Sequence, residues 1–156
     1  MKITFISMGK TNFPFLREGI ELYKNRIDHY INFEVIEIPD KKQGGSDPII
    51  ITKREGEAIL SKIAANDFLV ILDEKGKEMA SVEFAKFLGI KMNQQAKRIV
   101  FAIGGAYGFS EAVYDRANAS FSLSKLTFSH QLVRIIFLEQ LYRAFTILKG
   151  EPYHHS

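Results

Sequence analysis

The sequence contains no cysteine among its 156 residues, so disulfide bonds, thiolate metal sites and a catalytic thiol are excluded. Tryptophan is absent as well, and the aromatic core material comes mainly from 13 phenylalanines. No apolar run is long enough to cross a bilayer, and no segment has the pattern of a signal peptide. We therefore expect a cytoplasmic protein with no membrane partner.

Motifs that would indicate metal or nucleotide chemistry are also missing. The triplet GKT at 9–11 lacks the glycine that a phosphate loop requires five residues earlier, where Thr4 stands. The glycines at 104, 105 and 108 do not have the GxGxxG spacing of a dinucleotide site, which disfavours a nucleotide-dependent oxidoreductase. The histidines have no metal-ligand spacing, so we expect no metal; they are His29, His130, His154 and His155.

The composition is that of an ordinary folded protein, with 46% hydrophobic and 25% charged residues. The length fits one domain, and we expect residues 1–156 to form it. The net charge of +3 favours an anionic partner only mildly and is no nucleic-acid signature by itself.

Hydrophobic patterning predicts strands that alternate with helices along the whole chain. The Pro and Gly content of 40–48 indicates a loop, the polar run 74–77 a turn, and Ser81 a helix N-cap. Strict alternation favours an α/β fold with a mostly parallel sheet covered by helices on both faces. The expected strands are 2–8, 33–38, 67–73, 98–103 and 120–124; the expected helices are 14–30, a segment ending near 65, 82–92, a short one after 110, and 130–149.

Three loops of such a sheet are expected to meet at one edge. They follow Leu72, Ile103 and Leu123, and ligands of open α/β sheets bind beyond the carboxyl ends of the strands. The glycines at 104, 105 and 108 have two interpretations: they allow a tight turn, or they leave a bare backbone surface for a flat heteroaromatic ligand. His130, at the start of the last helix, is a capping residue or a proton-transfer group.

The last expected helix, 130–149, is apolar on almost every side. Such a helix needs a second cover, and we expect the same helix of another subunit in a two-fold dimer. Arg134 and Arg143 interrupt it, as paired charges or as groups that reach an anionic substrate. Gly150 and Pro152 end the helix, which leaves residues 153–156 as a tail able to reach a neighbouring site.

Five motifs, in order and in spacing, resemble the ribosomal RNA large subunit methyltransferase H family of the SPOUT superfamily. The resemblance covers essentially the whole chain. The motifs are ILDEKGK at 71–77, FAIGGAYG at 101–108, LSKLTFSHQLVR at 123–134, EQLYRAF at 139–145 and PYH at 152–154.

This resemblance implies a C-terminal trefoil knot, a homodimer, and S-adenosylmethionine as cofactor. It implies methylation of N3 of a pseudouridine in helix 69 of 23S rRNA, within the assembled ribosome. The cofactor positions of the family fall on Leu72, Gly104, Leu123, Ser124, Lys125, Leu126, Thr127 and Phe128, with Gly105 and Gly108 in the same glycine loop.

The residues that would carry the chemistry remain open at this point. A cation would favour the deprotonated pseudouridine and a base would accept its proton. An alternative is a module of the same fold that binds RNA or the ribosome without catalysis. The catalytic candidates are His130, Arg134, Arg143, Tyr153 and His154.

Overall fold

The computed structural model describes residues 1–40, 47–94 and 96–155. Within them, five parallel strands form one sheet in the order β2-β1-β4-β3-β5. The predicted alternation of strands and helices is confirmed. The strands are β1 (Lys2–Met8), β2 (Asn32–Ile38), β3 (Phe68–Glu78), β4 (Arg98–Ile103) and β5 (Ala119–Ser122); the helices are α1 (Pro14–Asp28), α2 (Pro48–Leu60), α3 (Ser81–Asn93), α4 (Glu111–Arg116) and α5 (Leu132–Leu148).

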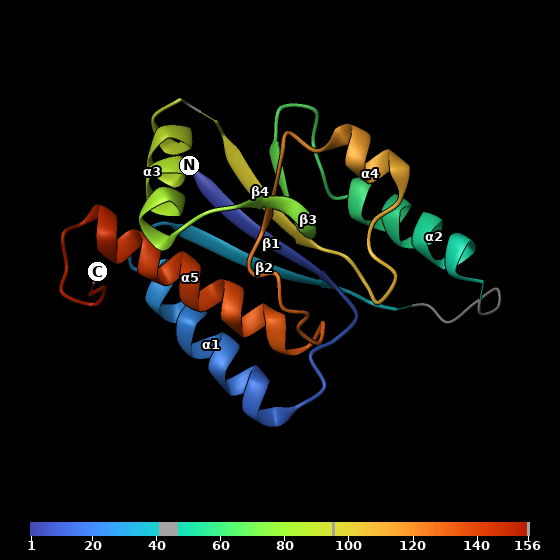
Figure 1. Ribbon diagram of the computed structural model, residues 1–156, viewed down its shortest axis with the longest axis horizontal. Helices are drawn as coiled ribbons and strands as arrows, with labels where there is room; N and C mark the ends of the chain where they lie inside the picture. Colours follow the sequence, from blue (N-terminus) through green and yellow to red (C-terminus); the bar gives the residue numbers. More distant parts are fainter. Residues whose placement is uncertain (41–46, 95, 156) are drawn as a thin grey trace.

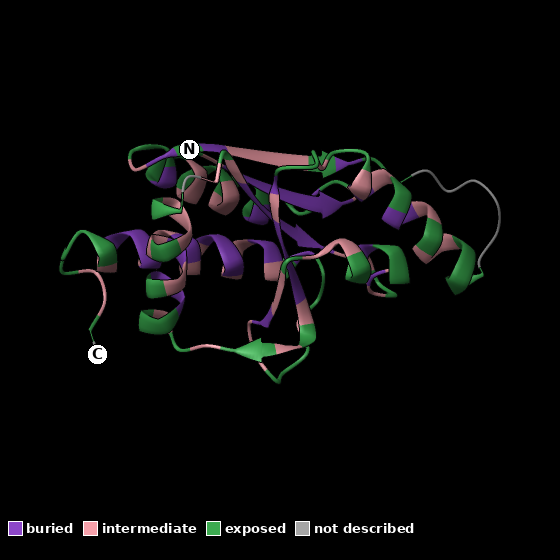
Figure 2. Cartoon of the chain, turned by 90° about the horizontal axis from the view of Figure 1, so that it is seen from above, coloured by how far each residue is buried: buried purple, intermediate pink, exposed green. Residues whose placement is uncertain are grey.

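Helices cover both faces of this sheet, as the sequence predicts (Figure 1). Helices α1, α3 and α5 lie on one face, and α2 and α4 on the other. In β4, Phe101 packs with the first group while its neighbours Val100 and Ala102 pack with the second. Side chains alternate across a strand, so a strand between two layers must be apolar throughout. Buried residues accordingly concentrate on the strands (Figure 2).

The expectation of a turn at 74–77 is wrong, because β3 continues to Glu78. Phe121 of β5 pairs first with Leu72 and, after a register shift, also with Lys77. A Cβ atom added to Gly76 would lie 2.6 Å from the Cα of Phe121. The two chain segments therefore cross in close contact at a position that only glycine can occupy.

Two further predicted boundaries are corrected by specific hydrogen bonds. The N-cap of α3 is Ala80, whose backbone N–H donates to the Glu83 carboxylate at 2.7 Å, while the Ser81 hydroxyl donates to Gln140 instead. Strand β5 ends at Ser122 and α5 begins at Leu132. The intervening segment 123–131 is therefore a loop. Most of the predicted loop 40–48 lies outside the described residues.

Helix α5 is covered on its buried side by its own chain, and the second-subunit cover that the sequence predicts stays a prediction. The helix lies on the sheet between α1 and α3 (Figure 1). Phe137, Leu138 and Leu141 are completely buried there, and apolar exposure concentrates near the ends, at Leu132 and Leu148. Gly150 follows the helix with a φ of 68°, as expected of the residue after a C-cap. In the described part of the chain, no helix has the length and apolarity that crossing a membrane requires.

Candidate functional site

A cavity of about 560 Å³ lies at the carboxyl ends of β3, β4 and β5. The expectation that three segments share one edge is confirmed, although only those after Ile103 and Ser122 are loops, since residues 73–75 belong to β3. Nine of the ten predicted cofactor residues line it, and only Lys125 does not. The nine are Leu72, Gly104, Gly105, Gly108, Leu123, Ser124, Leu126, Thr127 and Phe128.

The glycine loop after β4 combines both interpretations of its glycines. Gly108 has a φ of 79° and donates its N–H to the carbonyl of Gly105 at 3.1 Å, so it closes a tight turn. Gly104 requires its missing side chain for another reason, since a Cβ atom there would lie 2.9 Å from the carbonyl oxygen of Gly108. The loop therefore lines the cavity with bare backbone, and a side chain at Gly104 would collide with the loop itself.

Glu55 of α2 lies against Gly105 of this loop. The residue is not identified from the sequence alone. A Cβ atom on Gly105 would overlap its carboxyl group. The side chain is buried, and its Oε1 atom has no hydrogen-bond partner among the described residues. Burial raises the pKa of Glu55, the charge of Asp40 raises it further, and Arg54 opposes the rise. The available signal was its position four residues before the core residue Ile59, which places a carboxyl group in the apolar stripe of the helix.

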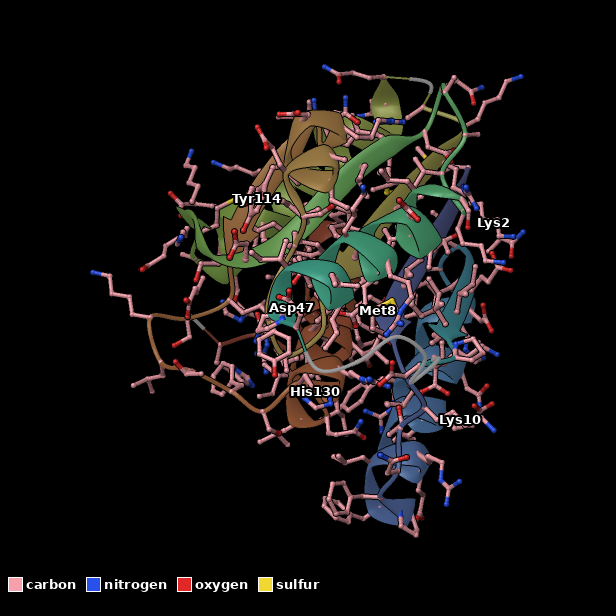
Figure 3. The ribbon with its side chains drawn as sticks, turned by 90° about the vertical axis from the view of Figure 1, so that its right-hand side faces the viewer. Lys2, Met8, Lys10, Asp47, Tyr114 and His130 are labelled. Carbon is pink, nitrogen blue, oxygen red and sulfur yellow. The ribbon has the colours of Figure 1, made fainter. Side chains whose placement is uncertain are left out.

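The wall formed by residues 123–131 is shaped by serine side chains. The Ser122 hydroxyl donates to the carbonyl of Ser124 at 2.8 Å, and the Ser124 hydroxyl accepts from the N–H of Leu126 at 3.0 Å. His130 follows, exposed and on the cavity wall. Figure 3 looks onto this end of the molecule, with Tyr114 and His130 labelled.

Acidic groups lie on the opposite wall, which Asp73 and Glu74 help to form. The Tyr114 hydroxyl donates to Asp73 at 2.5 Å. Burial, followed by this hydrogen bond, raises the pKa of Tyr114 to about 12. Tyr114 is therefore a protonated donor at neutral pH, and the carboxylates leave this wall suited to a cationic ligand.

Arg134 does not reach this cavity, which corrects the expectation that it contacts an anionic substrate. Its side chain is only 2% exposed. The guanidinium donates to the carbonyls of Met8 and Gly9 at 2.6 and 2.9 Å, and to the Glu37 carboxylate at 3.0 Å. It also donates to the Thr11 hydroxyl and to the carbonyl of His130. These contacts tie the start of α5 to the end of β1.

Arg143, Tyr153 and His154 lie together, but at the other end of α5. The Glu139 carboxylate accepts from Arg143 at 2.5 Å and from the Tyr153 hydroxyl at 3.0 Å. Burial raises the pKa of Tyr153, as do its hydrogen bonds with Tyr23 and Glu139, so its hydroxyl stays protonated. Arg143 lies ten residues beyond Val133, the α5 residue that lines the cavity, or about 15 Å along the helix axis. The structure therefore does not bring this cluster to the cavity of its own chain.

The tautomer of His154 follows from its partner. An Arg143 Nη1 atom lies 3.2 Å from His154 Nδ1. Because an arginine side chain only donates, Nδ1 must accept, which places the proton of the neutral ring on Nε2. In this arrangement the Nε2–H group of His154 is free to act as a donor.

A cofactor with a cationic centre and a flat heteroaromatic ring fits these residues. The cavity volume lies within the roughly 300–1,000 Å³ of typical ligand sites. Gly104 and Gly105 allow the ring to approach the backbone, and Asp73 and Glu74 suit the positive charge. Among the described residues, no group of three histidine or carboxylate side chains is placed to hold a metal ion.

A family model described as "Predicted SPOUT methyltransferase" matches residues 1–154 of the chain. The chain belongs to the SPOUT methyltransferase family. Its C-terminal part therefore has the SPOUT trefoil knot. Sequence rules alone do not suggest a knot, because knots are rare.

SPOUT proteins of closely similar length are among the curated relatives. Three of them are named "Ribosomal RNA large subunit methyltransferase H". The protein of Parabacteroides distasonis is 53% identical and covers 100% of both chains. That of Christiangramia forsetii is 52% identical over 99% of both, and that of Cytophaga hutchinsonii is 49% identical over 99% of this chain and 100% of its own.

Proposed function

We propose that this SPOUT protein uses S-adenosylmethionine to methylate N3 of a pseudouridine in helix 69 of 23S rRNA, on the assembled ribosome. The observation that carries the proposal is the cavity lined by the segments after Leu72, Ile103 and Ser122, with its bare glycine backbone and acidic wall. The full-length similarity to proteins named as large subunit rRNA methyltransferases supports the choice of substrate.

In this proposal, the loops at Leu72, Gly104 and 123–128 hold the cofactor. When bound, S-adenosylmethionine supplies a methyl group already activated by its sulfonium. The protein then needs mainly to orient the ring nitrogen in line and to remove its proton. His130 is suited to accept that proton, because it is the only imidazole among the described residues that line the cavity.

Arg143, Tyr153 and His154 act in this proposal as donors to the RNA. Tyr153 keeps its proton, Arg143 is cationic, and His154 carries its proton on Nε2. The cluster lies about 15 Å along α5 from the residue of this helix that lines the cavity, so in this proposal it serves the site of a partner in a homodimer. Each active site would then combine the cofactor loops of one protomer with the tail of the other.

Calorimetry with S-adenosylmethionine tests the cofactor assignment. We expect the wild-type protein to bind, and Gly104→Val to lose binding because its side chain would collide with the Gly108 backbone and distort the loop that lines the cavity. Gly89→Ala on α3 is the control, since an added Cβ atom meets only the Leu148 side chain, at 3.1 Å. Absence of binding by the wild-type protein would overturn the proposed function.

The role of His130 requires a separate measurement. We expect His130→Ala to bind cofactor normally while the rate of methylation falls by about 100-fold or more, as is usual for loss of a general base. Wild-type rates in this variant would assign the proton transfer to another group.

A further inference from the structure

A second cavity, of about 700 Å³, lies between α2 and the glycine loop. Pro48 and Ile49, in the first turn of α2, line one side, and Tyr107 and Phe109 line the other. Tyr107 and Phe109 also line the candidate cofactor cavity. The two hollows therefore lie on either side of one loop, and a ligand in the second is adjacent to the proposed reaction centre. We call the second hollow the α2 groove.

Tyr107 is the exposed aromatic residue on the ridge between these hollows. Its side chain is 55% exposed, whereas Phe109 beneath it is buried. Within the described part of the chain, the Tyr107 ring has neither an aromatic partner nor a side-chain hydrogen bond. Ile49, which lines the same groove, is 78% exposed. An aromatic face and an aliphatic side chain thus line one groove without being covered by the described structure.

The charges at this groove restrict its occupant. Lys53 is the only cation among its described lining residues, and Glu57 and Glu111 contribute two carboxylates. A phosphate would be repelled by this balance, whereas a neutral base would not, and its amino groups can donate to carboxylates. Lys75, on the rim of the cofactor cavity, is better placed to contact an RNA backbone.

We propose that the α2 groove holds one base of the RNA strand next to the target nucleotide, stacked on Tyr107 and packed against Ile49. The proposal rests on the proposed function, which brings an RNA strand to the neighbouring cavity. Single-stranded bases are commonly held by stacking on aromatic side chains, because every base has an apolar face. Tyr107 is then a positioning residue for the substrate strand and not a catalytic residue.

Four variants test this assignment through the KM for ribosomes and through binding to ribosomes in cosedimentation. Tyr107→Ala should raise both KM and the dissociation constant by about ten-fold or more, the effect expected from the loss of one stacked base. Tyr107→Phe keeps the ring and should behave as wild type. Ile49→Ser should weaken binding, while Ile50→Ser should not, because Ile50 is 50% exposed on the same helix but does not line the groove.

S-adenosylmethionine affinity should be unchanged in Ile49→Ser and Ile50→Ser, because neither residue lines the cofactor cavity. Tyr107 lines both cavities, so Tyr107→Ala should lower the affinity for ribosomes more than the affinity for the cofactor. Wild-type ribosome binding by Tyr107→Ala, equal loss in Tyr107→Phe, or a larger loss of cofactor affinity than of ribosome affinity in Tyr107→Ala would overturn the stacking role. Ribosome binding is read without methylation, so an inactive wild-type protein would refute the proposed function while leaving this comparison decisive.

Discussion

Glu55 is a carboxyl group that the fold buries beneath Gly105, with one oxygen lacking a hydrogen-bond partner among the described residues. Burying an ionised group without a partner is costly, so the neutral form is favoured. The contact explains why glycine suits residue 105 even though its φ is not positive, since a side chain there would require the Glu55 carboxyl group to move. The same carboxyl group makes the stability of the cofactor loop depend on pH.

The sign of this dependence follows from the raised pKa of Glu55. Below its ordinary value of 4.5, the group is protonated in both the folded and unfolded states, and it adds no penalty. As pH rises through the raised folded pKa, the unfolded state loses its proton first and the free energy of unfolding falls. Glu55→Gln should therefore stabilise the protein at neutral pH and have a smaller effect near pH 4.5.

Urea denaturation of this variant at several pH values measures the effect. Glu57→Gln is the matched control, because it removes one carboxylate from the exposed side of the same helix. Equal pH dependence in wild type and Glu55→Gln would show that the buried carboxyl group does not titrate as described.

At the scale of elements, α5 is fixed at its start by Arg134. Five hydrogen bonds connect this side chain to the end of β1, the segment that follows it, β2, and the loop residue His130 just before α5. Removing this buried donor leaves the carbonyls of Met8 and Gly9 without a hydrogen bond that they accept from it. Arg134 is therefore expected to contribute to stability and to the position of the loop 123–131, not to contact the substrate.

Arg134→Met should lower the free energy of unfolding by about 1–3 kcal/mol, because the carbonyls of Met8 and Gly9 lose their donor, whereas the exposed Glu37 carboxylate can be solvated by water. Arg134→Lys should be intermediate, since one ammonium group cannot reach all these acceptors. Arg17→Met, on the exposed side of α1, should change stability by less than about 1 kcal/mol. Denaturant unfolding measures all three. A fully stable but inactive Arg134→Met protein would indicate a role for Arg134 in the reaction.

Hydrophobic patterning predicts the strands and helices well wherever their burial follows from their own sequence or from their place between two layers of helices. The apolar run of β4 and the alternation of strands and helices were sufficient for the parallel sheet and for the edge at which three loops meet. Residues 74–77 were assigned to a turn because their polarity is local, whereas their strand pairing depends on Phe121, more than forty residues away. Glu55 was missed for a similar reason, because its contact with Gly105 exists only after folding.

At the scale of the whole molecule, the distance between the cavity and the tail decides how the site is completed. Tyr153 and His154 are held against α5 by Glu139 and Arg143, at the end of the helix remote from His130. The sequence predicts a tail that reaches a neighbouring site. In the folded chain, the tail residues Tyr153 and His154 do not line the cavity of the same chain. A composite site in a homodimer follows from the proposed function.

Mixing two inactive variants tests that arrangement. Gly104→Val lacks a working cofactor cavity, and a chain truncated after Gly150 lacks the tail. If each site combines two protomers, a purified heterodimer of the two regains one working site, because the intact cavity of one chain meets the intact tail of the other. If each site is instead contained within a single chain, both sites of the heterodimer stay inactive, and methyl transfer to ribosomes stays at background.

The most direct measurement of the central claim is mass mapping of 23S rRNA from ribosomes treated with the protein and labelled S-adenosylmethionine. We predict one new methyl group, on N3 of a pseudouridine in helix 69, which requires assembled ribosomes and is absent with Gly104→Val. A methyl group on another nucleotide, transfer to free rRNA but not to ribosomes, or no transfer at all would contradict the proposed function.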